Sequence, residues 1–459
     1  MHSTHNPAKA TSSLRKKARS LLRHGAALLI VATLLIATGC GPAELLSAEE
    51  RQIIVLWHTF TGAEAEAVET LTDRFNDANP WQIVLITEYQ EDLLDKLRRQ
   101  DAPESRPDLI TIWPKDLQSY VALDMVGVPP THSPEIADAW GDILPMAGAL
   151  YEVDGVPQAL PLGLATYLAY FNLDWLGDLS YDSEVANWED FRRTACGATD
   201  PLRGQIGVGV PARASLLLAF LAASGSEIVG EDDYYQFSDE SGRAAASVLH
   251  AVMSAECGMV YQDRDEGLAR LSKSSMAMIV ESSEYLSQVQ RAILAGRNFQ
   301  LGVSPLPGSA GPGPTLWYGP GLMISAPEGE RQVAALRALA WFFSPESQRY
   351  WGQTTEYIPI RRSVVEAELE RIDQMPLVSS EISLLEITLN AADSGDWVAW
   401  PQATNRIACR AALLRGLLAL QEMDADTDAY VETAVTACNT GVGFRTEPSP
   451  SPTPDPETP

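Results

Sequence analysis

The chain has 459 residues, 46% of them hydrophobic, and carries 33 Lys and Arg against 61 Asp and Glu, a formal net charge of −28. This length exceeds the roughly 250 to 300 residues at which a single hydrophobic core stops growing, so the chain can form two or three domains. Its acidity argues against a nucleic-acid-binding protein, because phosphate contacts require clustered Lys and Arg.

The first forty residues differ in composition from the rest of the chain. Residues 1–39 contain six Lys and Arg and no Asp or Glu, and they end in the apolar run Gly25–Gly39. This run is shorter than the roughly 20 residues that a membrane-spanning helix needs. It leads into Ala37-Thr38-Gly39-Cys40, which resembles the bacterial lipobox. Residues 1–39 are therefore predicted to be a lipoprotein signal peptide, with a lipid-modified Cys40 and a tether over 40–50. A plain secretory signal and an uncleaved anchor are the alternatives.

Cysteine and histidine usage bounds the chemistry of the exported chain. Apart from Cys40, four cysteines follow the signal: Cys196, Cys257, Cys409 and Cys438. We expect the first to pair with the second and the third with the fourth, because these pairings close shorter loops than the crossed alternatives. The three histidines that follow the signal lie far apart in sequence: His58, His132 and His250. No His-built metal site is expected.

The first elements in chain order predict a parallel sheet. Ile53–Trp57 is a continuous apolar run, typical of a strand buried on both faces. A helix is predicted around Ala65–Phe75, a strand at Ile83–Ile86, a helix around Leu93–Leu97 and a strand at Leu109–Ile112. Strands that alternate with helices in this way form parallel sheets with right-handed crossovers.

Further elements follow along the chain. Strands are predicted at 276–280 and 322–325, and helices at 215–223, 241–255, 333–343, 408–423 and 430–440. Residues 446–459 are rich in Pro with Ser, Thr, Asp and Glu, and are predicted to form a disordered tail.

Motifs of the common enzyme classes are absent. The chain contains neither a phosphate-binding G-x-x-x-x-G-K-[ST] loop, nor a G-x-S-x-G elbow, nor H-E-x-x-H. Gly207–Ala212 fits G-x-G-x-x-A, but only Gln205-Ile206 precedes it where a dinucleotide loop needs a full strand. No cofactor and no catalytic residue are therefore predicted, although a glycosidase pair among the many acids stays open.

Aromatic residues follow each of the first three predicted strands. The first strand ends in Trp57-His58, the second runs into Glu88-Tyr89 and the third is followed by Trp113. In an open parallel sheet, ligands bind outside the carboxyl ends of the strands, so these side chains are predicted to face one crevice. Flat aromatic faces beside polar groups suit a sugar ring, whereas the alternative is that each is a core or rim aromatic.

The order of these and later segments resembles the extracellular solute-binding proteins of carbohydrate ABC importers. The segments that carry the resemblance are Ile54–Gly62, Arg106–Ile110, Gln158–Leu162, Tyr170–Asn172, Lys273–Met278, Pro305–Gly308, Gly319–Ser325, Ala340–Gln348, Tyr357–Arg361 and Glu432–Asn439. The resemblance implies a two-lobed α/β fold of the periplasmic-binding-protein class II type. Each lobe would be a mostly parallel sheet flanked by helices, with the ligand cleft between the lobes.

The resemblance also implies domain limits and site residues. The N-terminal lobe would comprise 51–162 plus 305–345 and the C-terminal lobe 163–304 plus 346–445, with crossings at 161–164, near Pro305 and within 344–359. The implied ligand-binding residues are Trp57, His58, Tyr89, Trp113, Glu281, Tyr285, Trp317, Tyr318 and Tyr357. Trp317–Gly321 departs from the Gly-Gly pair usual at this place in the family.

The function implied is capture of a solute, without catalysis. A lipid-anchored, monomeric protein outside the cell membrane would deliver a sugar or oligosaccharide to ABC permease subunits. Glycerol 3-phosphate or another polar solute is the alternative ligand; few Lys and no visible basic cluster weigh against a phosphate, although one or two Arg suffice to bind one. The alternatives from other classes are a surface glycoside hydrolase and a structural or adhesion lipoprotein without a ligand.

Overall fold

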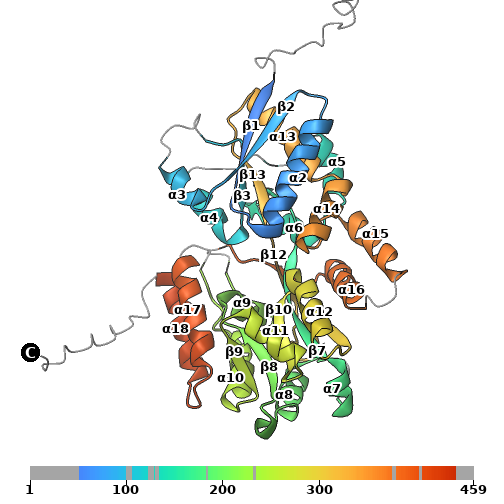
Figure 1. Cartoon of the computed structure of the whole chain (residues 1–459). Helices are drawn as coiled ribbons and strands as arrows, with labels where there is room; N and C mark the ends of the chain where they lie inside the picture. Colours follow the sequence, from blue (N-terminus) through green and yellow to red (C-terminus); the bar gives the residue numbers. More distant parts are fainter. Residues whose placement is uncertain are drawn as a thin grey trace, which may run out of the picture. The chain divides into compact units, whose positions relative to one another are not determined.

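A computed structural model gives the structure of the chain (Figure 1). It describes residues 51–99, 106–121, 123, 129, 134–181, 185–230, 234–374, 379–402 and 406–440. The chain divides into the units Met1–Gln52 and Ile53–Pro459, and apart from Gln52, the first residue of β1, the described strands and helices all lie in the second unit. The predicted signal peptide, the tether, Cys40 and the tail at 446–459 lie outside the described residues.

A five-stranded sheet contains the elements predicted at the start of the chain. Its strands are β1 (Gln52–His58), β2 (Ile83–Tyr89), β3 (Leu109–Ile112), β6 (Leu160–Pro161) and β13 (Gly321–Ile324), in the order β2-β1-β3-β13-β6. β1 and β3 are parallel, as predicted, whereas β13 runs antiparallel to β3 and β6. The helices around this sheet are α2 (Gly62–Ala78), α3 (Leu93–Arg98), α13 (Glu330–Phe342) and α14 (Pro345–Thr355). We call this assembly the first lobe.

A seven-stranded sheet forms the centre of the second lobe. Its strands are β7 (Ala165–Asn172), β8 (Ile206–Pro211), β9 (Gly258–Tyr261), β10 (Met276–Ser282), β11 (Leu301–Pro305), β12 (Thr315–Tyr318) and β14 (Trp397–Ala399). The order is β14-β12-β7-β10-β8-β9, with β11 also paired to β7. β7 runs antiparallel to β10, β11 and β12, while β10–β8, β8–β9 and β12–β14 are parallel. The sheet is therefore mixed rather than mostly parallel, because β7 enters from the first lobe against the direction of its neighbours.

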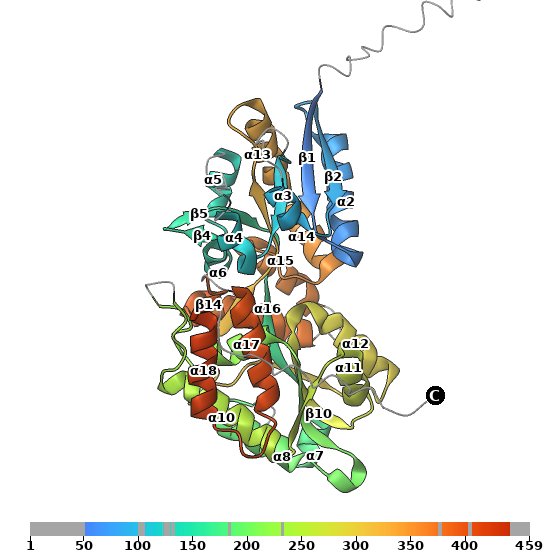
Figure 2. The same ribbon diagram turned by 90° about the vertical axis from the view of Figure 1, so that its left-hand side faces the viewer.

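Further helices and short strands connect the strands of both sheets. The remaining elements are η4 (Pro114–Asp116), α4 (Leu117–Val121), α5 (Pro134–Trp140), α6 (Pro145–Ala149), β4 (Glu152–Val153), β5 (Val156–Pro157), α7 (Leu173–Asp178), α8 (Trp188–Gly197), η6 (Pro201–Arg203), α9 (Ala214–Ala223), α10 (Glu240–Ser254), α11 (Arg264–Ser272), η7 (Ser283–Tyr285), α12 (Leu286–Ala295), α15 (Arg362–Asp373), α16 (Ser379–Ser394), α17 (Arg406–Ala419) and α18 (Thr427–Thr440). α17 and α18 lie side by side (Figure 2), and α17 also contacts α9. α17 ends earlier than the predicted 408–423, with a turn in place of its last residues.

Alternate residues of β7 belong to two different cores, which explains why most of the strand is apolar. Leu168 and Tyr170 lie in the core that continues into the first lobe, and Ala169 and Phe171 lie in the core beneath α9, α10 and α17. All eight residues of β7 are buried. A strand covered on both faces needs apolar side chains at every position, rather than at every second one.

The chain passes between the lobes at neighbouring places. Leu162–Leu164 joins β6 to β7, and Gly319–Pro320 joins β12 to β13. The predicted crossing near Pro305 is wrong, because the strands on both sides of it pair with β7. A Cβ on Gly319 would lie 1.9 Å from the carbonyl oxygen of Gly163, so the two crossings approach too closely for any side chain.

The residue limits of the two lobes, 51–162 plus 305–345 and 163–304 plus 346–445, remain a prediction. The strands of 305–345 divide between the sheets, β12 in the larger and β13 in the smaller. α14, which lies within the predicted C-terminal lobe apart from its first residue, contacts α2 of the first lobe.

Two disulfides stabilise the second lobe. Cys196 at the end of α8 is bonded to Cys257 just before β9, and Cys409 in α17 is bonded to Cys438 in α18. This is the pairing that the sequence predicted.

Candidate functional site

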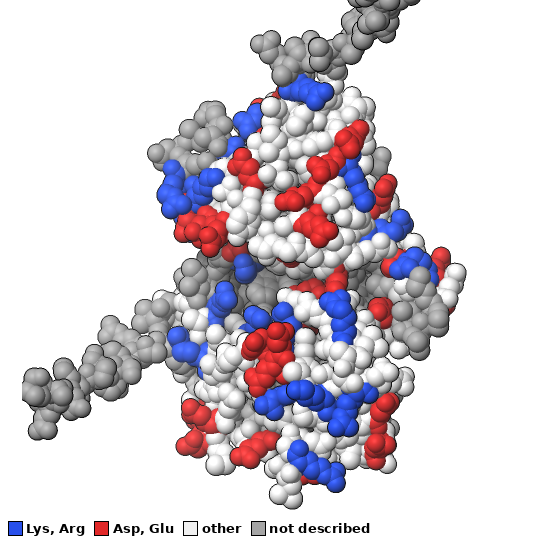
Figure 3. All heavy atoms as spheres, in the orientation of Figure 1, with Lys and Arg blue, Asp and Glu red and all other residues white. Residues whose placement is uncertain are grey.

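A cavity of about 620 Å³ lies between the two lobes. This volume falls within the range of small-molecule binding sites. The first lobe lines it with Trp113–Asp116, and the second lobe supplies the other described residues of the wall. Figure 3 shows the surface hollowed between the region around α2 and the region around α11 and α12, with Lys and Arg side chains beside the hollow.

The second-lobe wall lies at the edge of the larger sheet that holds the carboxyl ends of β8, β10, β12 and β14. β8, β10, β12 and β14 all point toward this edge, because β10–β8 and β12–β14 are parallel pairs and β7 runs against both β10 and β12. Residues at these strand ends reach the cavity: Ala212–Ser215 after β8, Glu281 and Ser282 of β10, Tyr318 of β12 and Trp400 after β14. The principle that ligands bind at the carboxyl ends of strands therefore holds for this sheet.

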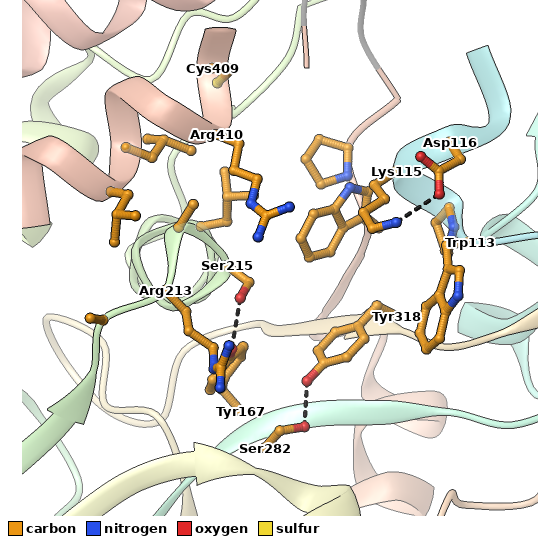
Figure 4. A pocket seen from close by; sticks show the side chains of 18 of the residues that line it. Trp113, Lys115, Asp116, Tyr167, Arg213, Ser215, Ser282, Tyr318, Cys409 and Arg410 are labelled. Carbon is orange, nitrogen blue, oxygen red and sulfur yellow. Dashed lines mark hydrogen bonds and ion pairs between the residues drawn. The ribbon is translucent and has the colours of Figure 1, made fainter. Parts of the chain in front are cut away.

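Aromatic rings occupy both sides of the cavity. The Tyr318 ring lies 6.0 Å from that of Tyr167 and 5.8 Å from that of Trp400, centroid to centroid. Figure 4 shows Trp113 across from Tyr318, on the side of the first lobe. An aromatic face on each side suits a flat ligand with apolar C–H groups, such as a sugar ring.

Hydroxyl groups link the aromatic wall to the strands beneath it. The Tyr167 and Ser215 hydroxyls are 2.7 Å apart, and the Tyr318 hydroxyl is hydrogen-bonded to Ser282. Burial raises the pKa of Tyr318 well above its ordinary value, so its phenol stays neutral. These groups both donate and accept hydrogen bonds, as binding of sugar hydroxyls requires.

An ion pair closes the floor of the cavity beside β10. Arg264 Nε donates to Glu281 Oε2 at 3.2 Å, and Tyr261 donates to the same oxygen at 3.3 Å. The other oxygen of Glu281 accepts the backbone N–H of Ser282 at 3.0 Å. The Arg264 guanidinium also lies 3.1 Å from the centroid of the Tyr285 ring. Both carboxylate oxygens of Glu281 are thus occupied within the protein.

Glu284 is an acid without such a cation partner at hydrogen-bond distance among the described residues. Its carboxylate lies 3.5 Å from the Tyr318 hydroxyl. Burial, and to a smaller extent the charge of the nearby Glu281, raise the pKa of Glu284 to about 8. Glu284 is therefore mostly neutral at pH 7 and can act as a hydrogen-bond donor as well as an acceptor.

Four of the predicted ligand residues line this cavity. They are Trp113, Glu281, Tyr285 and Tyr318. Trp317, one residue before Tyr318, points the other way: it is fully buried, and its Nε1 donates to Thr315 Oγ1 at 2.7 Å. Successive residues of a strand face opposite sides of a sheet, which is why the Trp317 ring lies on the side of β12 away from the Tyr318 ring.

The other four predicted residues, Trp57, His58, Tyr89 and Tyr357, lie away from the cavity wall. Trp57 is buried beneath Lys96, with its Nε1 hydrogen-bonded to Glu88 at 2.9 Å. His58 lies between Phe60 and Tyr89, and its burial lowers its pKa. Tyr89 itself is half-exposed. Tyr357 is buried against Trp351. None of the four belongs to the described wall of the cavity.

Several wall residues were not predicted from the sequence, among them Tyr167, Arg213, Ser215, Arg264, Trp400 and Arg410. One signal was available for Trp400. Trp400-Pro401 follows a strand just as Trp113-Pro114 does, and the chain contains no other Trp-Pro pair. Proline ends the strand and leaves the preceding aromatic at the sheet edge.

Two negative findings apply to the described residues. Among them, no group of three or more His, Cys, Asp or Glu side chains is placed to hold a metal ion. Nor does any described helix combine the length and apolar character needed to cross a bilayer.

Comparison with solved structures shows the fold. The chain is similar to the cyclic α-maltosyl-1,6-maltose binding protein of Arthrobacter globiformis, with a TM-score of 0.69, 17% identity, and 85% of this chain and 98% of that chain covered. It is also similar to the GacH receptor of Streptomyces glaucescens, solved unliganded and with acarbose, with a TM-score of 0.66, 18% identity and coverage of 84% and 97%. UgpB of Mycobacterium tuberculosis, solved with glycerophosphocholine, gives a TM-score of 0.65, 19% identity and coverage of 84% and 97%.

Comparison by sequence shows the family. No match was found among curated proteins. Residues 70–376, which are more than half of the chain, match the family described as "Bacterial extracellular solute-binding protein". The fold, the cavity between its lobes and this match agree. The chain therefore belongs to the bacterial extracellular solute-binding proteins.

Proposed function

We propose that the protein captures a sugar or oligosaccharide outside the cell membrane and delivers it to the permease of an ABC importer. A lipid on Cys40 anchors it, and it acts as a monomer without catalysis. The observation that supports this most is the cavity itself. Trp113 faces it from the first lobe, Tyr318 and Trp400 face it from the second, and hydrogen-bonding hydroxyls lie between them.

Capture follows from contacts with both lobes. A ligand that touches Trp113 and Tyr318 together is bound best when the lobes are closed, and only differential affinity of this kind shifts a conformational equilibrium. A closing motion has to bend the backbone where it passes between the lobes: at Leu162–Leu164, at Gly319–Pro320, and between α14 and β14. Small-angle scattering tests this motion, because the radius of gyration should fall when ligand saturates the protein.

A thermal-shift screen against mono- and oligosaccharides tests the function directly. Ligand at 100 times its Kd stabilises the native state by roughly 2.7 kcal/mol, which raises the melting temperature measurably. The neutral sugars maltose, maltotetraose and glucose form the first panel, with glycerol 3-phosphate as the alternative solute. If no member of the panel stabilises the protein, this function is contradicted.

A glycoside hydrolase is the competing activity, because Asp116, Glu281 and Glu284 all line the cavity. Glu281 is fully hydrogen-bonded to protein groups and Asp116 is paired with Lys115 at 2.7 Å, so neither is free to activate water in this arrangement. Incubation of each bound sugar with the protein, followed by chromatography, should recover it unchanged. Hydrolysis that is lost in Glu284→Gln would establish the enzyme instead.

Export and anchoring rest on the sequence of residues 1–40. Mass spectrometry of the membrane fraction should find Cys40 as the modified first residue. A Cys40→Ser protein that is still processed and retained in the membrane would contradict the anchor while leaving solute capture intact.

A further inference from the structure

The described part of the cavity wall contains four cations, Lys115, Arg213, Arg264 and Arg410, which fall into two groups. Lys115 and Arg264 have acidic partners within the wall: Lys115 Nζ lies 2.7 Å from Asp116, and Arg264 Nε lies 3.2 Å from Glu281. The charges of these pairs cancel locally. These two ion pairs therefore give little net attraction to a charged ligand, whether it is an anion or a cation.

Arg213 and Arg410 differ from Lys115 and Arg264. Both side chains are exposed to the cavity, and neither forms an ion pair with any carboxylate that the structure describes. Figure 4 shows Arg410 reaching into the cavity from α17, and Arg213 at the start of α9 beside Ser215 and Tyr167. The chain has 61 acidic against 33 basic residues, so a wall with two unneutralised guanidiniums runs counter to its overall charge.

The first turn of α9 adds to this positive potential. α9 is a ten-residue helix that begins at Ala214, directly after Arg213, and no side chain caps its N-terminus. Ala214 and Ser215, in its first turn, line the cavity. The free N–H groups and the dipole at a helix N-terminus favour a negatively charged group.

Glu284 does not oppose an anion in this place. Burial raises the pKa of Glu284 to about 8, so it is mostly uncharged at neutral pH. With Asp116 and Glu281 each paired to a cation, the unbalanced charges among the described residues of the wall are those of Arg213 and Arg410.

We propose that the solute carries an anionic group, a phosphate or a carboxylate, which binds between Arg213, Arg410 and the first turn of α9. Its polyol or sugar part then contacts Trp113, Tyr318 and Trp400. This inference rests on the proposed solute-capture function and names the chemical class of the solute. Guanidinium groups bind both phosphate and carboxylate through paired hydrogen bonds, which is why the two anions share one site.

Calorimetry with matched solutes tests the proposal. The pairs are glycerol with glycerol 3-phosphate, and glucose with glucose 6-phosphate and with glucuronate, with maltose and maltotetraose as longer neutral sugars. At least one anionic solute should bind tenfold or more tightly than its neutral partner. Comparison of glucose 6-phosphate with glucuronate then distinguishes phosphate from carboxylate.

Variants connect the preference to the two arginines. Arg213→Gln and Arg410→Gln should each weaken binding of the anionic solute about tenfold or more, and change binding of its neutral partner less than twofold. Arg213→Lys should retain part of the affinity. The matched control is Arg203→Gln, which removes an exposed cation that does not line the cavity and should leave binding unchanged.

The outcomes separate the inference from the function beneath it. If neutral sugars bind as tightly as the anionic ones, or if both Gln variants bind the anionic solute within twofold of the parent, the inference is overturned while solute capture stands. If neither neutral nor anionic solutes bind, the proposed function fails and the inference fails with it.

Discussion

The two lobes contribute unequally to the cavity. The second lobe provides a wall of strand ends whose side chains are already bonded to one another, as in the Tyr167–Ser215 and Tyr318–Ser282 pairs and the Arg264–Glu281 ion pair. From the described part of the first lobe, the wall receives the single segment Trp113–Asp116. A ligand thus meets a preorganised surface on the second lobe and gains the contact with Trp113 only when the lobes approach. Preorganised groups cost little entropy on binding, so the second lobe is expected to select the ligand and the first lobe to retain it.

The largest expected effect concerns the core beneath the second-lobe wall. Trp317→Ala should lower the free energy of unfolding by about 3 to 5 kcal/mol, because it removes a fully buried ring beside Tyr318. Urea denaturation followed by circular dichroism measures this. Trp81→Ala is the control, since Trp81 is 41% exposed, and its loss should cost little. An unchanged urea midpoint for Trp317→Ala would contradict the view that this wall depends on the core beneath it.

The next effect concerns the helix that carries Arg410. Replacing Cys409 and Cys438 together by Ser should lower the free energy of unfolding by about 3 to 4 kcal/mol, because the bond closes a loop with a sequence separation of 29. Ligand affinity should also fall, since Cys409 lines the cavity. The Cys196→Ser and Cys257→Ser double variant is the control, with a comparable loss of stability but no loss of affinity. Equal affinity in both double variants would show that α17 is not part of the site.

The contribution of the first lobe is tested at Trp113. Trp113→Ala should weaken ligand binding by about 2 kcal/mol, more than tenfold in Kd, with little effect on stability because this ring is only half-buried. Calorimetry with the best ligand of the screen measures it, again with Trp81→Ala as the control. Binding within twofold of the parent would mean that the second lobe alone holds the ligand.

The smallest effect is a pH dependence at Glu284. Burial raises the pKa of Glu284 to about 8, so the folded protein holds this proton more tightly than the unfolded chain does. The stability contributed by the protonated group is fully present below the ordinary pKa of Glu and is lost as the pH rises through about 8. Glu284→Gln should therefore melt higher than the parent at pH 9, by about 1 to 3 °C, and no higher at pH 4. An equal gain at both pH values would assign the effect to packing rather than to ionisation.

Whether a predicted residue reaches the cavity depends on which face of a strand it occupies. Trp113 and Tyr318 reach the cavity, and Trp57 and Trp317 enter cores, although all four lie at or just beyond a strand end. A continuous run of apolar residues locates a strand that is covered on both faces. It does not indicate which face meets a ligand, because the residues of both faces are apolar. The Trp-Pro pair at Trp400 shows that a stronger local signal existed for one residue of the wall.

The sequence alone determined much of the local structure and the absence of common enzyme motifs, and it predicted the disulfide pairing that the structure has. The export signal at 1–39 stays a prediction from the sequence. Apolar runs and helical spacing suffice for the strands and helices, because these depend on neighbours in the chain. The tertiary structure alone decided that β7 runs against its neighbours, that the crossing lies at Gly319–Pro320, and that Arg213 and Arg410 share one cavity. These depend on pairings between segments up to about two hundred residues apart, and a sequence pattern carries no record of which distant strand lies beside which.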